Sequence, residues 1–227
     1  MAAIRALRLE QPQTPQDGIV EMMTPDYWEQ AKLELAERDA VLRELVGRFQ
    51  GLAMGSRGDA FSTLARSIVG QQISVKAAQS VWDRLNARLD GVAPTSLARC
   101  RMPSLRACGL SGQKAAYLKD LAGKFLDGTL DAGRWHALED EALIVELTRV
   151  KGIGRWTAEM FLMFYLARPD VLPIADLGLQ RAMRLNYNRG RPLSPARMQK
   201  IGTAWAPWRS VATWYLWRSL DPIPVEY

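Results

Sequence analysis

Apolar residues recur at helical spacing along most of the sequence, and this periodicity limits most strongly how the chain can fold. Stripes at i, i+3, i+4 and i+7 run through residues 42–49, 61–68, 78–89 and 118–126. Segments that alternate apolar and polar residues, as half-buried strands do, are nearly absent. The pattern therefore predicts an all-α fold of about ten short helices.

Local signals place the ends of several helices. Asp26 is the expected N-cap of the first helix, and Ser194-Pro195 is expected to open a late one. The nearly all-apolar segment 155–166 predicts a central helix that is buried on most sides. Residues 1–25 contain several prolines and no sustained periodicity, so we expect an irregular arm there.

The charge balance favours a polyanionic partner. The chain of 227 residues has 30 Lys and Arg against 24 Asp and Glu, a formal net charge of +6. Nucleic acid is the first candidate partner and a membrane surface the second. No apolar run approaches the ~18 residues that a bilayer span requires, and the N-terminus lacks the order of a signal peptide. We therefore expect a cytoplasmic protein that does not enter the membrane.

The scarcity of metal-binding and nucleophilic side chains narrows the chemistry. His136 is the only histidine, and Cys100 and Cys108 are the only cysteines. Zinc sites, cysteine-ligated iron–sulfur clusters and Ser-His-Asp catalysis are hard to build from this set, so no metal site is predicted. An enzyme of this composition would work mainly with carboxylates, amides and backbone groups.

The segment 147–158 has the order helix, Gly-x-Gly turn, helix. Gly152 and Gly154 allow a sharp turn that can approach another surface closely, and the helix that follows offers unpaired N–H groups at its start. Such a terminus binds phosphate oxygens, and Lys151 and Arg155 add positive charge. The alternative is an ordinary helix–helix turn whose glycines serve packing.

Four segments together resemble the 3-methyladenine DNA glycosylase II family of the helix-hairpin-helix superfamily. They are VKGIGRWTA at 150–158, LPIADLG at 172–178, IVGQQIS at 68–74 and WAPWRS at 205–210. Their order matches that of the family, and they span roughly residues 60 to 220. About sixty residues precede the resemblance, so the chain resembles the compact form, without the N-terminal β-rich domain that some members carry.

The resemblance implies two helical lobes with a DNA-binding cleft between them. One lobe would combine residues 26–60 with 172–227, and the central lobe, residues 61–171, would contain the helix-hairpin-helix. The hairpin would lie on one lip of the cleft and Asp176 at its mouth. Two positions depart from the family: Lys151 stands where many members have proline, and Met160 where some have an aromatic pocket residue.

Asp176 is the catalytic residue that the resemblance implies. Cleavage of an N-glycosidic bond builds positive charge on the sugar, and a carboxylate beneath it stabilises that charge and orients water. A compatible structural role is the N-cap of a helix starting near Leu177. Asp170 is the rival by proximity, but it follows Arg168-Pro169 and has the setting of a turn residue.

The resemblance also assigns the base pocket and the DNA contacts. Trp156, Trp208 and Met160 would line the pocket, since an alkylated purine is cationic and stacks on electron-rich rings. Gln72 would fill the gap left by the flipped base. The alternatives are core tryptophans and a plain loop between helices. The DNA-binding set comprises Gln71, Gln72, Ile73, Lys151, Gly152, Ile153, Gly154, Arg155 and Thr157.

The resulting hypothesis is a monomeric, monofunctional DNA glycosylase that removes 3-methyladenine and related lesions from double-stranded DNA in base excision repair. In bifunctional members a lysine occupies the position that Trp156 fills here, so no lyase step is expected. No cofactor is expected, and the family leaves open a monovalent cation at the hairpin. A helix-hairpin-helix DNA-binding protein without catalysis is the alternative function.

Overall fold

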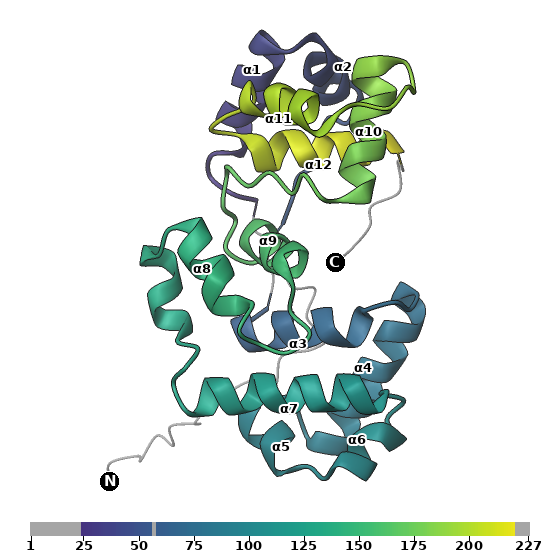
Figure 1. Ribbon diagram of the computed structural model, residues 1–227, viewed down its shortest axis with the longest axis vertical. Helices are drawn as coiled ribbons and strands as arrows, with labels where there is room; N and C mark the ends of the chain where they lie inside the picture. Colours follow the sequence, from purple (N-terminus) through teal and green to yellow (C-terminus); the bar gives the residue numbers. More distant parts are fainter. Residues whose placement is uncertain (1–23, 56–57, 221–227) are drawn as a thin grey trace, which may run out of the picture.

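The computed structural model describes residues 24–55 and 58–220, and within them the chain is helical without a β-strand (Figure 1). This confirms the predicted all-α fold. Within the same residues, no helix combines the length and the apolar character needed to cross a membrane. The predicted arm at 1–25 lies almost entirely outside the described residues.

Twelve α-helices and one 3-10 helix follow one another in the described ranges. They are α1 (Trp28–Arg38), α2 (Ala40–Arg48), α3 (Ala60–Gly70), α4 (Val75–Leu89), α5 (Pro94–Arg99), α6 (Met102–Ala107), α7 (Gly112–Leu126), η1 (Ala132–Ala137), α8 (Asp140–Leu147), α9 (Arg155–Phe164), α10 (Leu177–Asn188), α11 (Pro195–Thr203) and α12 (Arg209–Leu220).

Side-chain caps fix where several helices begin. Asp39, Asp59 and Ser74 accept hydrogen bonds from first-turn N–H groups of α2, α3 and α4. Ser194 does the same for α11, with Pro195 at the first helical position, which confirms that prediction. Each cap satisfies a backbone donor that a helix start would otherwise leave unpaired.

The prediction that Asp26 caps the first helix is wrong. The N-cap residue of α1 is Tyr27, and its side chain makes no capping bond. The Trp28 N–H donates to the Pro25 carbonyl at 2.9 Å, so a turn through Asp26 leads into the helix. The Tyr27 hydroxyl donates to the Ala167 carbonyl at 2.7 Å, which ties the start of α1 to the loop after α9.

Helices from the two ends of the chain pack together. We call α1, α2, α10, α11 and α12 the terminal lobe; α1 packs on α2 and α12, and α12 also packs on α2 and α10 (Figure 1). The Asp39 carboxylate accepts hydrogen bonds from the Tyr187 hydroxyl at 2.8 Å and from Trp205 Nε1 at 3.2 Å. These bonds join the N-terminal helices to the C-terminal ones.

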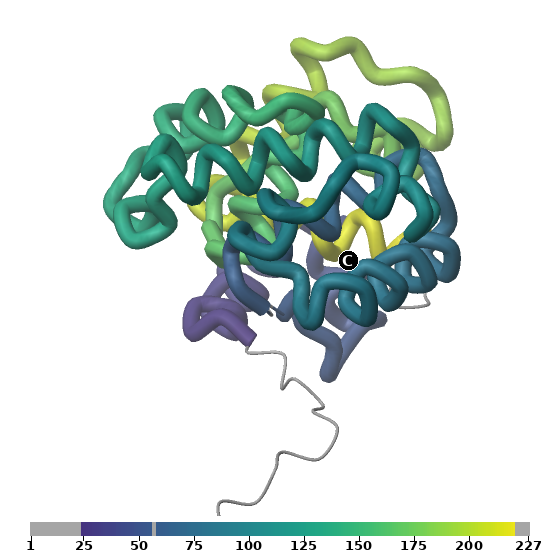
Figure 2. The backbone as a smooth tube through the Cα atoms, turned by 90° about the horizontal axis from the view of Figure 1, so that it is seen from below, coloured from purple at the N-terminus to yellow at the C-terminus, as the bar shows by residue number. Residues whose placement is uncertain are grey.

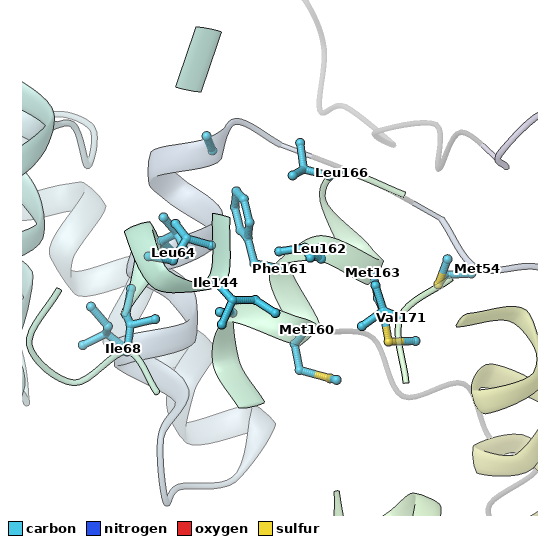
Figure 3. Packing of buried hydrophobic residues seen from close by; sticks show 14 of the residues in the cluster. Met54, Leu64, Ile68, Ile144, Met160, Phe161, Leu162, Met163, Leu166 and Val171 are labelled. Atoms are coloured by element: carbon cyan, nitrogen blue, oxygen red, sulfur yellow. The ribbon is translucent and has the colours of Figure 1, made fainter. Parts of the chain in front are cut away.

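The helices between them form the central lobe, α3 to α9 with η1. Phe61, Phe125, Trp135 and Phe161 follow one another edge to face and connect α3, α7, η1 and α9. Residues 157–163 of α9 are all buried, which confirms the predicted central helix. Figure 3 shows side chains of α3 on one side of α9 and Met54 and Val171 on the other. The predicted lobe boundaries at 60/61 and 171/172 stay predictions.

Candidate active site

The Asp176 carboxylate lies where three helices meet. It is the N-cap of α10, and its Oδ1 accepts hydrogen bonds from the Leu179 N–H at 2.6 Å and from Trp217 Nε1 of α12 at 2.8 Å. Its Oδ2 accepts one from Trp156 Nε1 of α9 at 2.8 Å. The N-cap prediction is confirmed, and three N–H donors fix the orientation of both carboxylate oxygens.

Trp217 is a neighbour of Asp176 that sequence reasoning did not select. Its ring stacks on Phe164, with centroids 6.0 Å apart and an interplanar angle of 17°. Gly178 leaves room for the hydrogen bond between Trp217 and Asp176, because an added Cβ there would lie 3.0 Å from Asp176 Oδ1 and 3.2 Å from Trp217 Nε1. In the sequence Trp217 is one tryptophan among eight, so no local signal marks it.

Trp156 presents an open aromatic surface beside the carboxylate. Its side chain is 43% exposed although Nε1 is engaged by Asp176. Met160 follows one helical turn later on the same face of α9 and is 8% exposed. An exposed indole next to a fixed negative charge suits a flat, cationic ligand.

The assignment of Trp208 to the same pocket is wrong. Its indole is 9% exposed, Nε1 donates to Glu34 Oε2 at 2.8 Å, and the ring stacks on Tyr27 with centroids 5.6 Å apart. Trp208 therefore belongs to the core of the terminal lobe, the alternative that its helical setting had left open. The second tryptophan at the carboxylate is Trp217.

Asp170, the rival carboxylate, is occupied by an ion pair. Its Oδ1 lies 2.6 Å from Arg209 Nε, and its Oδ2 lies 2.9 Å from Arg209 Nη2. This two-point pair ties the loop after α9 to the first residue of α12. Asp170 is therefore paired with a cation, whereas the partners of Asp176 within residues 24–55 and 58–220 are neutral N–H groups.

The Gly-x-Gly turn between α8 and α9 depends on one glycine in particular. Gly152 has φ +86°, and an added Cβ would lie closer to the Tyr117 ring than van der Waals contact allows. Ile153 is buried, and its N–H donates to the Val150 carbonyl at 3.1 Å. The Lys151 N–H donates to Asp120 Oδ2 at 2.9 Å, which fixes the turn to α7.

The Asp120 carboxyl is held in its charged form at the base of the turn. Burial alone would raise its pKa. The hydrogen bonds from the Lys124 ammonium and from the Lys151 N–H outweigh this effect and lower the pKa below its ordinary value. The turn is thus anchored by a charged acceptor.

The start of α9 is open to an anion. Its N-cap residue, Gly154, has no side chain to accept the first-turn N–H groups, and an added Cβ would point into open space. The Lys151 side chain is exposed beside it. Free N–H groups and a nearby cation are the usual components of a phosphate site.

Three residues of the predicted DNA-binding set have side chains that are paired or buried, and their contacts with DNA stay predictions. Arg155 is engaged by the carboxylates of Glu141, at 2.9 Å from Nη1, and Glu159, at 3.0 Å from Nε. Burial raises the pKa of Glu159, and this arginine opposes the shift. Thr157 and Ile153 are buried.

The loop between α3 and α4 is fastened to the same turn. Gln71 Nε2 donates to the Gly152 carbonyl at 2.8 Å. The Lys114 ammonium donates to the carbonyls of Val69 at 2.8 Å and Gln71 at 2.6 Å, and burial lowers its pKa. Gln72, with φ +57°, and Ile73, 41% exposed, present their side chains to solvent in this loop.

The fold and the turn define an all-α protein of the helix-hairpin-helix class. The model of the family described as "HhH-GPD superfamily base excision DNA repair protein" matches residues 65–207. The chain belongs to this superfamily.

Relatives and solved structures agree with this membership. DNA-3-methyladenine glycosylase 1 of Schizosaccharomyces pombe is 34% identical over 184 residues, which cover 78% of this chain and 80% of that protein. The crystal structure of a DNA-3-methyladenine glycosidase from Bacillus halodurans superimposes with a TM-score of 0.77 at 34% identity, over 84% of this chain and 89% of the other. The structure of the S. pombe 3-methyladenine DNA glycosylase in complex with abasic DNA superimposes with a TM-score of 0.71 at 29% identity, over 86% of this chain and 100% of the other.

Proposed function

We propose that the protein is a monofunctional DNA glycosylase that hydrolyses the N-glycosidic bond of 3-methyladenine and related alkylated bases in double-stranded DNA. The hydrogen bond between Trp156 Nε1 and Asp176 Oδ2 carries this proposal. Trp156 is the second residue of the helix that follows the hairpin, so the element suited to the DNA backbone directly adjoins a fixed carboxylate. The names of the relatives point to the same substrate class.

Asp176 stabilises the charge that develops as the bond breaks. The departing alkylated base takes the bonding electrons, and the sugar ring becomes cationic. A carboxylate already oriented by three N–H donors needs no reorganisation to face that cation, and it directs the attacking water. A DNA-binding protein without catalysis, the alternative function, would not need a carboxylate in this setting.

The exposed face of Trp156 receives the flipped base, with Met160 one turn further along α9. A base that carries a positive charge is attracted both to the indole face and to Asp176. Trp156 also occupies the position where the resemblance places the lysine of bifunctional enzymes. Without that amine no Schiff base forms, so the abasic strand remains intact.

The hairpin and the loop before α4 hold the DNA. The first N–H groups of α9 and the Lys151 ammonium bind a backbone phosphate, and Gln72 with Ile73 fills the space that the flipped base leaves. All of these groups lie on one chain, so the protein acts as a monomer. Its location is the cytoplasm. Hydrolysis of an already cationic base requires no organic cofactor; a monovalent cation at the hairpin stays a prediction of the resemblance.

A single-turnover assay on a duplex with one 3-methyladenine tests this function. We expect release of the free base, strand breakage only after alkali, and no borohydride-trapped complex, because the site lacks the amine. A normal duplex is the control. Breakage without alkali would contradict the monofunctional assignment, and no base release by the unmodified protein would favour the DNA-binding alternative.

The two tryptophans of the C-terminal region are expected to respond differently to loss of the indole N–H. Trp217→Phe removes one donor to Asp176, so excision should slow about tenfold or more, on the scale of ~1.5 to 3 kcal/mol for a hydrogen bond to a charged group. Trp208→Phe removes the bond to Glu34 and should lower the melting temperature by about 2 to 6 °C with excision unchanged. Thermal melts and single-turnover rates on both variants separate the roles. If Trp208→Phe excised the base more slowly and kept its melting temperature, the assignment of Trp208 to the base pocket would be correct after all.

A further inference from the structure

The positive charge of the chain is concentrated in one stretch. Between Leu177 and Leu220 the sequence has eight Lys and Arg residues and no Asp or Glu. The whole chain has a formal net charge of only +6, so the remainder is slightly acidic. This stretch begins directly after Asp176 and forms α10 to α12.

Part of this charge lies on the outer face of α10. Arg181 and Arg184 are exposed and share a helix face with Leu177, which is 78% exposed. The opposite face carries the buried residues Leu179, Ala182 and Met183. Arg189, the C-cap residue, and Arg191 continue the exposed cations into the next turn. This part of the chain, light green in Figure 2, extends outward from the body of the molecule. We call these four arginines the α10 cluster.

The α10 cluster has no counter-charge within the described residues. Other arginines nearby are paired with carboxylates, for example Arg168 with Asp140 and Arg209 with Asp170. In residues 24–55 and 58–220, none of the four side chains forms an ion pair with an acidic group. Like charges three residues apart on a helix repel each other, so the bare fold does not benefit from the arrangement. A polyanion bound there would benefit from it.

The spacing of the cluster suits DNA that reaches the candidate active site. At about 1.5 Å per residue, Arg181 and Arg184 lie roughly 7.5 and 12 Å along the α10 axis from Asp176. Those distances correspond to roughly two and four base-pair steps of 3.4 Å. A duplex whose flipped base lies at Asp176 and whose axis follows α10 would keep backbone phosphates within reach of both side chains.

We propose that the α10 cluster is a second contact for the DNA backbone, separate from the hairpin. The hairpin in the central lobe binds one part of the duplex, and α10 in the terminal lobe binds the arm that runs past that lobe. The placement of the lesion at Asp176 rests on the proposed function. The contact itself is to undamaged backbone, so it can be measured without base release.

The test uses the affinity of the full-length protein for an undamaged 20-base-pair duplex, measured at several salt concentrations. In the double variant Arg181→Gln/Arg184→Gln the slope of log affinity against log salt concentration should become shallower by about 1 to 2. Each lost phosphate contact reduces the slope by ~0.9. Affinity at 0.1 M salt should fall by up to about tenfold per contact. The matched control is Arg99→Gln/Arg106→Gln, two exposed arginines on α5 and α6, at the far end of the central lobe (Figure 1).

The outcomes separate this proposal from the glycosylase proposal. A slope that changes in the α10 variant and not in the control supports the α10 contact, whether or not the protein excises a base. An unchanged slope, or an equal change in the control, overturns it. Unchanged duplex binding together with lost binding to vesicles of phosphatidylglycerol and phosphatidylcholine would assign the face to a membrane surface, and this also overturns it. Arg181→Glu/Arg184→Glu provides a second variant whose stronger effect must have the same direction.

Discussion

Excision of 3-methyladenine by Asp176→Asn is expected to fall about a hundredfold or more. The amide keeps an oxygen for the Leu179 N–H, so the cap of α10 survives and the chain folds. The negative charge opposite the sugar cation is lost, and removal of one preorganised electrostatic partner is worth ~3 to 4 kcal/mol. The asparagine NH₂ group would replace Oδ2, which now accepts from Trp156 Nε1. Two donors would then face each other, and this hydrogen bond would be lost.

The control for this variant is Asp170→Asn, which removes a carboxylate of similar position in the sequence. Its partner is Arg209, so we expect a lower melting temperature and a near-normal excision rate. Single-turnover rates and thermal melts on the two variants provide the comparison. If Asp170→Asn lost excision while Asp176→Asn kept it, the assignment of Asp176 would be wrong.

Gly152→Ala is expected to damage both stability and DNA binding. A left-handed backbone with a side chain costs ~1 to 2 kcal/mol, and the collision with the Tyr117 ring adds ~1 to 3 kcal/mol of overpacking. In a chain of this size the sum corresponds to a melting temperature lower by about 5 to 15 °C. The turn would move, so affinity for lesion and normal duplexes should fall together, because the hairpin contacts backbone only.

Gly154→Ala is the matched control, with the same chemical change two residues later. Its φ of −93° suits any residue, and the added methyl group meets open space. The melting temperature should therefore fall much less than in Gly152→Ala, by no more than the small preference for glycine over alanine at an N-cap, and a loss of DNA affinity would report crowding of the phosphate. Equal destabilisation by the two substitutions would contradict the distinction between them.

The sequence predicted best what is determined locally. The caps at Asp176 and Ser194 follow from residue types next to the helix start, and the burial of α9 follows from its composition. The glycines of the hairpin were recognisable for the same reason, since the turn between α8 and α9 needs φ above zero at Gly152.

Apart from the start of α1, where Tyr27 and not Asp26 is the N-cap residue, the errors concern partners that lie far away in the sequence. Trp208 precedes α12 and Trp217 lies within it, and only the packing of α12 against α1 and α10 decides which indole faces Asp176. Arg155 lies one helical turn from its partner Glu159, but its second partner, Glu141, precedes it by 14 residues on another helix. Such choices depend on how whole helices are oriented, and periodicity within one helix does not contain that information.

The terminal lobe imposes an order on folding during synthesis. The hydrogen bond between Asp39 and Tyr187 can form only after Tyr187, which follows Asp39 by 148 residues, has been synthesised. At ~5 to 20 residues per second this interval lasts roughly 7 to 30 s. During that time the apolar faces of α1 and α2, with Leu35 and Leu42, have no C-terminal helices to cover them. The central lobe, α3 to α9, is synthesised within the same interval and is complete in the chain before Tyr187 is added. The hairpin is therefore synthesised before α10 and α12, which complete the surroundings of Asp176. The N-terminal helices are the part of the nascent protein most in need of protection from aggregation.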